Sequence, residues 1–530
     1  MTDETPDRPG RDTAPEVGRR IASTAAGAVG ALALAAGAFA LGIVLPADGA
    51  EGVVPAPVAV GAGTTDLVCP GPPRLPTTAT GDDIDYDAEL GPGPAGVSTD
   101  VSAVVLGDPA ATLDLLGAED PAPLTGASAG LDEVTGPALL RAGAIRGRAP
   151  LVTARTLARA DSGDLRGLAS ASCAVPSSSI WLVGAGTAVS SSAQLTITNS
   201  GDTPARVHLT GWSGTGPAPD IAPVLLAPAS SRTVLLEAVW LADRIALHLE
   251  SEGGRITAAI QDSRLDGLTP AGLDFVTSAA APATEILLGP APLPGYADPD
   301  DLDDSDDRDD PDDPGESADA AASVRIVNPN PTPATVDITA LGEDGEAEVA
   351  GAQNLVVEAG SVTQIPLAAR YAGSNGVRLR SDVPITGALE LSRPGRAGVD
   401  ETADPDVAPV DIAWLAAGVP STSALLAVGA ETNETHVLNP GERAARVTLT
   451  PILAGGRAGD PFELTVPPAS TAAVPTPAKA VLAWQIEATE PVLATTVVTA
   501  DVTDGRLLTV LPATAGIAGA AEVAVDLRIG

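Results

Sequence analysis

The feature that most constrains the fold of this chain is a unit that occurs three times. Each copy begins with a proline, small hydroxylated residues and an apolar run, and the prolines are Pro176, Pro282 and Pro420. A second block carries an apolar stretch to an asparagine, which is Asn199, Asn328 or Asn439. A serine follows each asparagine after roughly 31–33 residues, at Ser230, Ser361 and Ser470. Because order and spacing hold in every copy, the sequence predicts tandem copies of one structural unit.

Apolar residues within these blocks recur with a period of two. Val207 and Leu209 alternate with His208 and Thr210, which is the pattern of half-buried antiparallel strands. Glycine, proline and asparagine interrupt such stretches at short intervals, as in β-sandwiches. We therefore predict an all-β protein made of tandem immunoglobulin-like β-sandwich repeats. Repeats 1, 2 and 3 are expected at residues 173–270, 271–410 and 411–530.

The segment before the repeats, residues 66–172, is less regular but still rich in β-type sequence. Strands are expected at Val101–Leu106 and Leu151–Ala158, and a helix is expected near Ala138–Ala142. We predict a β-rich N-terminal segment that leads into repeat 1.

A long uncharged run lies near the N-terminus, from Ile21 to Leu45. A helix of this length, about 25 residues, spans a hydrocarbon core of about 30 Å. Arg19 and Arg20 precede the run, so the positive-inside rule places a tail at 1–20 in the cytoplasm. We predict a single-pass anchor at 21–45 in the cell membrane and a linker at 46–65, with the bulk of the chain extracellular. A cleaved signal peptide is the alternative, although its apolar stretch is normally only 7–15 residues long.

The chain has two cysteines, Cys69 and Cys173. An even number of cysteines in an oxidising compartment predicts a disulfide between them. Two unrelated buried thiols are the alternative. A metal site is less favoured, because neither cysteine has a second cysteine or a histidine at ligand spacing.

The charge of the chain excludes one broad class of function. There are 69 acidic and 29 basic side chains, a net charge of −40, which repels the phosphate backbone of nucleic acids. The densest acidic run is at 298–313. Its carboxylates suit Ca²⁺ as hard oxygen ligands, but it lacks the glycine and bidentate glutamate of an EF-hand. A solvated loop is the preferred interpretation.

Other candidate residues carry weaker signals. Ser128 lies in a G-x-S-x-G string, whose chemistry needs a strand-to-helix turn and a histidine, and prolines precede it here. His208 and His248 lie on polar strand faces in one repeat, where solvent exposure is expected rather than metal binding. Trp181 is expected in the core, and Asn433 begins a formal glycosylation sequon of little weight. We predict no catalytic, cofactor-binding or metal-binding residues.

Several strings resemble an uncharacterised family of single-pass envelope proteins of actinobacteria. They are the uncharged run, VCPGPPRL around Cys69, GDLRGLASASCAVP around Cys173 and the apolar-Asn-Pro turns. The resemblance covers the chain from about Gly18 and implies a membrane-anchored, largely extracellular protein of unknown function. It supplies no catalytic residues. Ser200 departs from the prolines of the other repeats, Pro329 and Pro440, but serine also suits a turn.

Two classes of function follow from these features. The first is a non-catalytic envelope protein, a scaffold, adhesion or accessory module that binds another envelope protein or a cell-wall polymer through loops or strand edges. The alternative is an envelope hydrolase acting on glycan or peptide, with carboxylates that meet at a domain junction. We expect the first class, because aromatic residues make up only 2% of the chain and no aromatic-lined cleft is indicated.

Overall fold

The computed structural model describes residues 57–76, 96–107, 109–293, 321–367, 373–399, 404–429, 431–475, 481–516 and 521–524. These residues fall into two compact units. In the smaller unit, β1 (Pro57–Val60) pairs with β36 (Ala521–Ala524) in antiparallel register. The predicted anchor at 21–45 and the acidic run at 298–313 lie outside the described residues. Within the ranges given above, no helical segment has the length and hydropathy that a membrane crossing requires.

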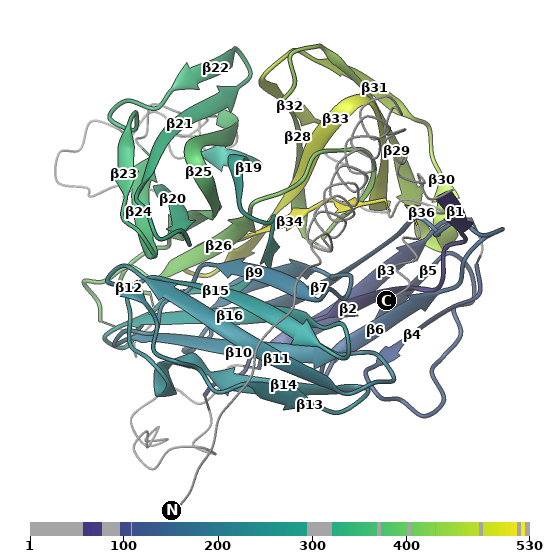
Figure 1. Cartoon of the computed structure of the whole chain (residues 1–530), viewed down its shortest axis with the longest axis horizontal. Coiled ribbons are helices and arrows are strands. Elements are labelled where there is room, and N and C mark those ends of the chain that lie inside the picture. Colours follow the sequence, from purple (N-terminus) through teal and green to yellow (C-terminus); the bar gives the residue numbers. More distant parts are fainter. Residues whose placement is uncertain are drawn as a thin grey trace, which may run out of the picture. The chain divides into compact units, whose positions relative to one another are not determined.

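The larger unit, Gly61–Ala520, is built almost entirely of antiparallel strands (Figure 1). Its first part, which we call the N-terminal module, consists of β2 (Thr65–Cys69), β3 (Ser98–Val105), β4 (Ala111–Leu115), β5 (Ser128–Leu131), β6 (Ala138–Ala142), β7 (Val152–Ala160) and β8 (Gly167–Ser172). By strand pairing, repeat 1 ends after β18 and repeat 2 after β26, instead of at residues 270 and 410. Repeat 1 thus consists of β9 (Ser179–Val183), β10 (Ser191–Asn199), β11 (Ala205–Ser213), β12 (Gly216–Pro217), β13 (Val224–Leu226), β14 (Ser230–Leu235), a 3₁₀ turn (Leu236–Ala238), β15 (Ile245–Glu252), β16 (Thr257–Asp266), β17 (Thr269–Val276) and β18 (Ser278–Ala279).

Repeats 2 and 3 follow the same plan. Repeat 2 consists of β19 (Ala283–Leu293), β20 (Ala321–Asn328), β21 (Ala334–Gly342), β22 (Gly345–Glu348), β23 (Leu355–Val357), β24 (Ser361–Leu367), β25 (Gly373–Pro394) and β26 (Val410–Ala416). Repeat 3 consists of β27 (Ser421–Ala427), β28 (Thr432–Asn439), β29 (Ala445–Leu453), a 3₁₀ turn (Ala454–Gly456), β30 (Arg457–Ala458), β31 (Phe462–Val466), β32 (Ser470–Val474), β33 (Val481–Val502), β34 (Gly505–Pro512) and β35 (Thr514–Ala515). The all-β prediction is confirmed for these residues.

The N-terminal module has the strand order of the repeats. Its strands pair in the orders β5-β3-β7-β8 and β2-β6-β4, and those of repeat 1 pair as β14-β10-β16-β17 and β9-β15-β11. In repeat 2 the long strand β25, and in repeat 3 the long strand β33, occupies the positions that β15 and β16 occupy in repeat 1. The described residues therefore contain four modules of one topology, although only three of them share the sequence blocks.

One secondary-structure expectation in the N-terminal module is wrong. The stretch Ala138–Ala142 forms β6, a strand that pairs with β2 on one side and β4 on the other. Ala138, Leu140 and Ala142 are buried and the residues between them are partly exposed. Alanine and leucine favour helices as isolated residues, but tertiary packing overrides that preference here. The strands expected at 101–106 and 151–158 are confirmed as β3 and β7.

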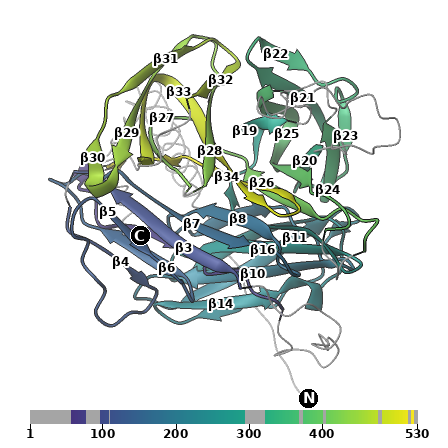
Figure 2. The ribbon, with the colours of Figure 1, turned by 180° about the vertical axis from the view of Figure 1, so that it is seen from behind.

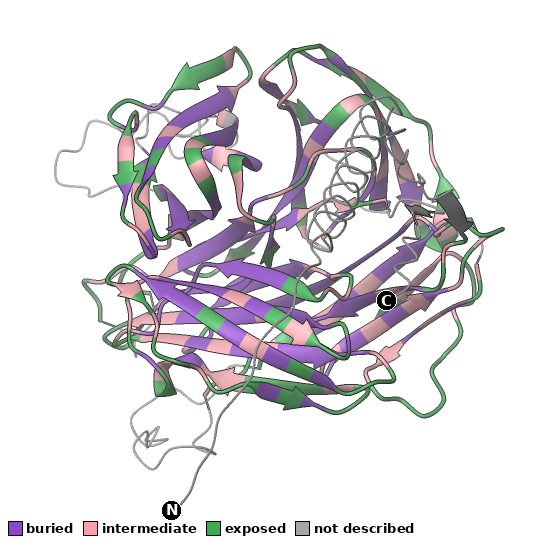
Figure 3. Ribbon diagram, viewed as in Figure 1, coloured by how far each residue is buried: buried purple, intermediate pink, exposed green. Residues whose placement is uncertain are grey.

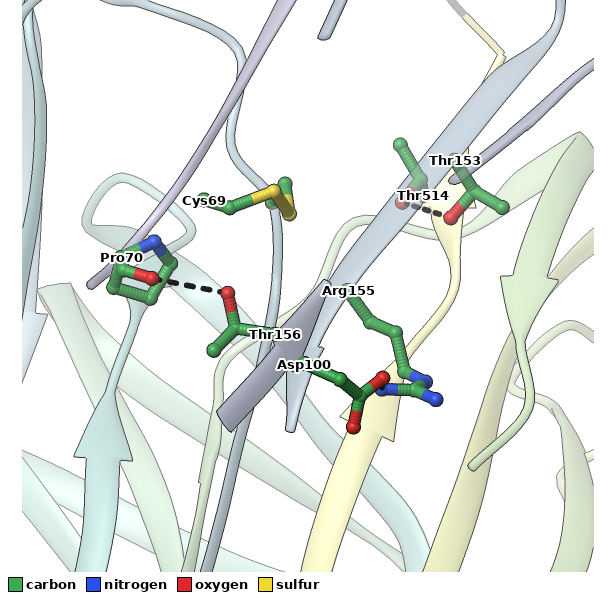
Figure 4. Close-up of a disulfide and its surroundings, with 8 residues drawn as sticks. Cys69, Pro70, Asp100, Thr153, Arg155, Thr156 and Thr514 are labelled. Carbon is green, nitrogen blue, oxygen red and sulfur yellow. Dashed lines mark hydrogen bonds and ion pairs between the residues drawn. A yellow bond between two sulfur atoms is a disulfide. The ribbon is translucent and has the colours of Figure 1, made fainter. Parts of the chain in front are cut away.

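The predicted disulfide joins Cys69, at the end of β2, to Cys173, just after β8. The two cysteines are 104 residues apart in sequence, so the chain-entropy estimate of the stabilisation is about 4–5 kcal/mol. Figure 4 shows the bond beside Pro70, whose carbonyl oxygen accepts the Thr156 hydroxyl at 3.0 Å. The first strand of the N-terminal module is thereby tied to its last strands.

The repeated asparagine has a definite structural role, which repeat 1 illustrates. Asn199 ends β10 and is fully buried. Its amide donates to the carbonyl oxygens of Thr203 and Ala227 at 2.8 and 3.0 Å, and its own oxygen accepts the N–H of Gly201 at 3.1 Å. Ser230, opposite Asn199 in the ladder, donates to the same Ala227 oxygen at 2.7 Å. We call this arrangement the asparagine clasp.

The clasp recurs in the other two repeats with the same geometry. The amide donates to the carbonyl four residues later and to carbonyls shortly before the serine, and the serine donates to one of these. The residues are Asn328, Thr332, Val357, Glu358 and Ser361 in repeat 2, and Asn439, Arg443, Val466, Pro467 and Ser470 in repeat 3. In every repeat the residue before the serine has a positive φ, 48° at Ala229, 61° at Gly360 and 49° at Ala469. The recurring Asn and Ser therefore stabilise one recurring turn.

The four modules form a closed cycle inside the larger unit. In each one, a backbone carbonyl in or shortly after the first strand accepts a side-chain hydrogen bond from the next module. The backbone oxygen of Arg74 accepts from the side chains of Gln194 and Gln261, and that of Ala185 accepts from Arg325. The backbone oxygen of Pro290 accepts from Thr495, and that of Val428 accepts from Arg155. The last bond runs from the N-terminal module to repeat 3. Thr153 and Thr514 meet across the same junction at 3.1 Å (Figure 4), so the first and last modules are in direct contact.

Candidate functional site

Polar side chains gather where the last strands of the four modules meet. These strands, β8, β17, β26 and β34, pack against one another, and Figure 2 shows β8, β26 and β34 side by side in the middle of the larger unit. Most of their residues are buried (Figure 3). We define the central junction as the polar groups of Ser170, Asp274, Asp411, Trp414 and Thr509.

Asp274 in β17 accepts a hydrogen bond from each of the other three modules. Its Oδ1 accepts the Ser170 N–H and the Thr509 hydroxyl, both at 3.1 Å. Its Oδ2 accepts the Trp414 N–H at 2.7 Å. The hydroxyls of Ser170 and Thr509 also contact each other at 2.8 Å. One carboxylate of repeat 1 thus joins all four modules.

Asp411 in β26 forms a second bridge. Its Oδ2 accepts the N–H groups of Leu168 at 3.2 Å and Leu508 at 2.9 Å. These amides belong to the N-terminal module and repeat 3. Nearby, Arg166 forms an ion pair with Asp504 at 2.7 Å, which also links those two modules. Both carboxylates of the junction are essentially without solvent contact, at 0% exposure for Asp411 and 1% for Asp274.

Burial sets the protonation behaviour of these carboxyls. Burial raises the pKa of Asp411 to about 7, against the lowering effect of its backbone hydrogen bonds and of Arg166. Burial also raises the pKa of Asp274 well above its ordinary value, and the nearby Asp411 raises it further. For Asp411, the shift means that ionisation is less favourable by about 4 kcal/mol than for an aspartate in water.

A charged cluster of Asp262, Arg264, Arg325 and Glu390 lies beside the central junction and joins repeats 1 and 2. Arg264 contacts Asp262 at 2.6 Å and Glu390 at 2.5 Å. Arg325 contacts Glu390 more weakly at 3.8 Å and donates to the Ala185 carbonyl. Two positive and two negative side chains therefore compensate one another.

Trp414 connects the charged cluster to the central junction. Its indole N–H donates to Asp262 at 2.9 Å while its backbone N–H donates to Asp274. The guanidinium of Arg325 lies over the ring, 4.7 Å from its centroid, and that of Arg264 lies 5.6 Å away. These are distances of cation–π contacts. The two buried networks therefore form one continuous unit across the modules.

The charges of this cluster stabilise each other. Burial lowers the pKa of Arg325 to about 10, so its guanidinium stays charged at neutral pH. Burial lowers the pKa of Arg264 too, but Asp262 and Glu390 raise it by more, and the net change is upward. Burial raises the pKa of Glu390, whereas Arg264 and Arg325 lower it by more, so the net change is downward. The cluster is thus a compensated set of charges, the condition under which buried ions are tolerated.

The chemistry open to these groups is limited by what already surrounds them. The polar hydrogens of Ser170, Trp414 and Thr509 are already bonded within the junction or to Asp262, and both junction carboxylates are buried. Among the residues that the structure describes, no group of three or more His, Cys, Asp or Glu side chains is arranged to hold a metal ion. The arrangement is suited to joining modules.

The sequence-predicted serine lies away from these groups. Ser128 begins β5, a strand, rather than a turn into a helix. Its hydroxyl accepts the N–H of Gly455 in repeat 3 at 3.2 Å. Ser128 therefore contributes to the junction that closes the cycle, and the strand context lacks the geometry that a nucleophile elbow needs.

The histidines of repeat 1 lie on one face of its sheet, as expected, and are partly exposed. His248 stacks on Trp181 with centroids 4.3 Å apart, and its Nε2 contacts the Ser179 hydroxyl at 2.8 Å. Burial lowers the pKa of His248. His208 lies 4.0 Å from Glu252. Both histidines thus have local polar neighbours, and they do not belong to the central junction.

The remaining candidates are structural. Trp181 is buried, as expected for a core residue, and stacks on Trp212 at 5.2 Å. The other three tryptophans, Trp240, Trp414 and Trp484, are buried too. Asn433 of the sequon is 6% exposed and its amide donates to the carbonyl oxygens of Gly429 and Glu431. Its nitrogen is therefore engaged inside the fold.

Sequence reasoning missed Asp274 and Asp411. Each stands inside an otherwise apolar strand, in the strings GLDFV and VDIAWL. A charged residue in a stretch that is buried on both faces is rare unless it is paired. This signal was visible in the sequence, but it did not reveal which groups the carboxylates would meet.

The fold and the junction define an all-β protein of cyclically packed modules joined by buried polar groups. Comparison with known families identifies its relatives. Residues 128–477 match the family described as "Family of unknown function (DUF5719)". Because this match covers roughly two thirds of the chain, the protein belongs to that family. The resemblance to an uncharacterised family is consistent with this finding.

Comparisons with individual proteins add little. No curated protein matches the chain. A solved structure described as "Crystal Structure of Thermotoga maritima 1070" matches with 16% sequence identity and a TM-score of 0.16, over 19% of this chain and 93% of that one.

Proposed function

We propose that this chain is a non-catalytic cell-envelope protein, anchored in the membrane by residues 21–45 and extracellular over the rest of its length. Its modules are immunoglobulin-like β-sandwiches. The block they form is a scaffold, adhesion or accessory module that binds another envelope protein or a cell-wall polymer. The disulfide between Cys69 and Cys173 supports an oxidising location.

One observation supports the non-catalytic proposal above the others. The carboxyl side chains that come together at the central junction are buried and bonded to other modules, as Asp274 and Asp411 illustrate. A hydrolase needs such groups to reach a substrate. Here their hydrogen-bonding capacity is directed to assembly.

A binding surface for the partner is suggested by two strands at the edges of their sheets. β13 pairs with β11, and β23 pairs with β21, in equivalent positions of repeats 1 and 2. The middle residue of each strand is exposed and apolar, Leu225 at 65% and Val356 at 60%. Open edges with apolar side chains favour addition of an extended strand from a partner.

The test is affinity capture from crosslinked membranes with the full chain as bait. The expected result is one stoichiometric envelope protein or cell-wall polymer. The double variant Leu225→Asp/Val356→Asp should lose it at least tenfold, or about 1.4 kcal/mol, whereas Val189→Asp, at a residue 90% exposed, should not. Turnover of a glycan or peptide by the purified chain, abolished by substitution of a junction carboxylate in a folded variant, would instead establish the hydrolase.

A further inference from the structure

The two carboxylates of the central junction have more negative charge around them than positive. The charge of Arg166 acts on Asp411, and Arg166 is itself paired with Asp504 at 2.7 Å. Across the strands, Asp411 lies opposite Arg393. Three carboxylates, those of Asp274, Asp411 and Asp504, therefore have two guanidinium groups as neighbours, those of Arg166 and Arg393.

The surroundings of Asp274 do not correct this imbalance. Asp262 lies opposite it in the β16–β17 ladder, and its charge is matched by Arg264 inside the charged cluster. From β8 and β34, Asp274 receives the neutral donors Ser170 and Thr509. With both junction carboxyls ionised, two adjacent buried charges would be held mainly by neutral N–H and O–H groups.

We propose that the central junction is a pH-sensitive lock, which holds the four modules together most tightly while Asp274 and Asp411 are both protonated and loosens as each carboxyl loses its proton. Asp411 has a site for that proton. Its Oδ1 is buried and accepts no hydrogen bond from any described residue. The lock acts on every module at once, because the amides bonded to the two carboxylates come from the N-terminal module and repeats 2 and 3.

The direction of the pH effect follows from linkage. In the closed state the pKa of Asp411 is about 7 because of burial, whereas an aspartate in water has a value of about 3.9. The closed state therefore binds the proton more tightly than an opened one. Through Asp411, closure is most favourable at low pH and weakens about tenfold per pH unit between about pH 4 and 7. Asp274, whose pKa burial also raises, weakens closure in the same direction as it ionises.

Hydrogen exchange of the full chain at pH 5.5 and 8, corrected for the intrinsic rate, measures this opening. Peptides that span the amides of Leu168, Trp414 and Leu508 should lose protection by about tenfold or more at pH 8. Peptides that span the Asn199 clasp serve as the internal control, because overall charge repulsion would affect them as well. Equal losses in both sets, or no loss in either, would overturn the proposal.

Substitution of the titrating group gives the second arm. Asp411→Asn should reduce the pH dependence of the junction peptides, and the double variant Asp274→Asn/Asp411→Asn should remove it, because only the double variant leaves no ionisable carboxyl there. Asp501→Asn, at an exposed aspartate that pairs with Arg506, should retain it. An Asp411→Asn chain with unchanged pH dependence would contradict the lock. If that variant fails to fold, the wild-type comparison of junction and clasp peptides still decides.

Discussion

The asparagine clasps and the central junction both bury polar groups, but they do so in opposite ways. Each clasp is local. Asn199 forms hydrogen bonds with backbone groups of its own repeat, and the equivalent Asn328 and Asn439 do the same in repeats 2 and 3. The central junction is shared: Asp274 takes one group from each of three other modules, and no two of these residues are alike. The contacts that stabilise a repeat recur in all three repeats, whereas the groups that meet at the central junction differ from module to module.

The polar contacts also distinguish the junction between repeat 3 and the N-terminal module, where the cycle closes, from the other junctions between modules. The repeats are similar enough to pack by similar contacts, as the recurring carbonyl acceptors show. The polar contacts around them differ between junctions, with a charged cluster between repeats 1 and 2 and threonine, arginine and backbone contacts between repeat 3 and the N-terminal module. Such differences favour one order of modules over the alternatives.

The largest expected effect comes from breaking a shared network. Arg264→Met leaves Asp262 and Glu390 without the cation that both contact, and should lower the free energy of unfolding by about 3–5 kcal/mol. Denaturant unfolding measures the change. Arg443→Met is the matched control, because Arg443 is 79% exposed in its pair with Glu490 and should cost less than about 1 kcal/mol. Similar costs for the two variants would refute a special role for the cluster.

A smaller effect is expected from the clasps, and its uniformity matters more than its size. Asn199→Ala, Asn328→Ala and Asn439→Ala each leave buried backbone groups unsatisfied, at about 3 kcal/mol. Because the three clasps have the same geometry, their costs should agree within about 1 kcal/mol in denaturant unfolding. A large cost at one asparagine and none at the other two would show that the clasps are not equivalent.

The smallest effect should come from a single donor of the central junction. Thr509→Val keeps the shape of the side chain but removes the hydroxyl that Asp274 accepts, at about 1–2 kcal/mol. Thr210→Val, at an exposed position on β11, should change stability by less than about 0.5 kcal/mol. If Thr509→Val proves neutral in thermal and denaturant unfolding, the junction is not maintained by its hydrogen bonds.

The same contrast explains which parts of the structure could be predicted. Alternation with period two and the spacing of Asn and Ser depend on local geometry, so the strands and the repeated turn could be recognised from the sequence. The residues of Ala138–Ala142 favour a helix, which is the element expected there, and only the pairing of β6 with β2 and β4 makes the stretch a strand. Long-range pairing is the information that a local pattern lacks.

The central junction could not be derived from the sequence for the same reason. Asp274 and Asp411 are 137 residues apart, and the groups they bond come from β8, β26 and β34. An aspartate in an apolar strand signals a buried partner, but the partner depends on how the modules close. Recognising the N-terminal module as a fourth copy also required its strand order, because it lacks the repeated blocks.

Closure of the cycle is tested most directly by a crosslink between its first and last modules. The hydroxyls of Thr153 and Thr514 are 3.1 Å apart, a separation compatible with a disulfide between cysteines. The full chain carrying Thr153→Cys and Thr514→Cys should form this bond within one molecule under a mild oxidant, as peptide mapping by mass spectrometry would show. The pair Thr153→Cys and Thr210→Cys should not. Free thiols, or bonds only between molecules, in the first variant would contradict a closed cycle of modules.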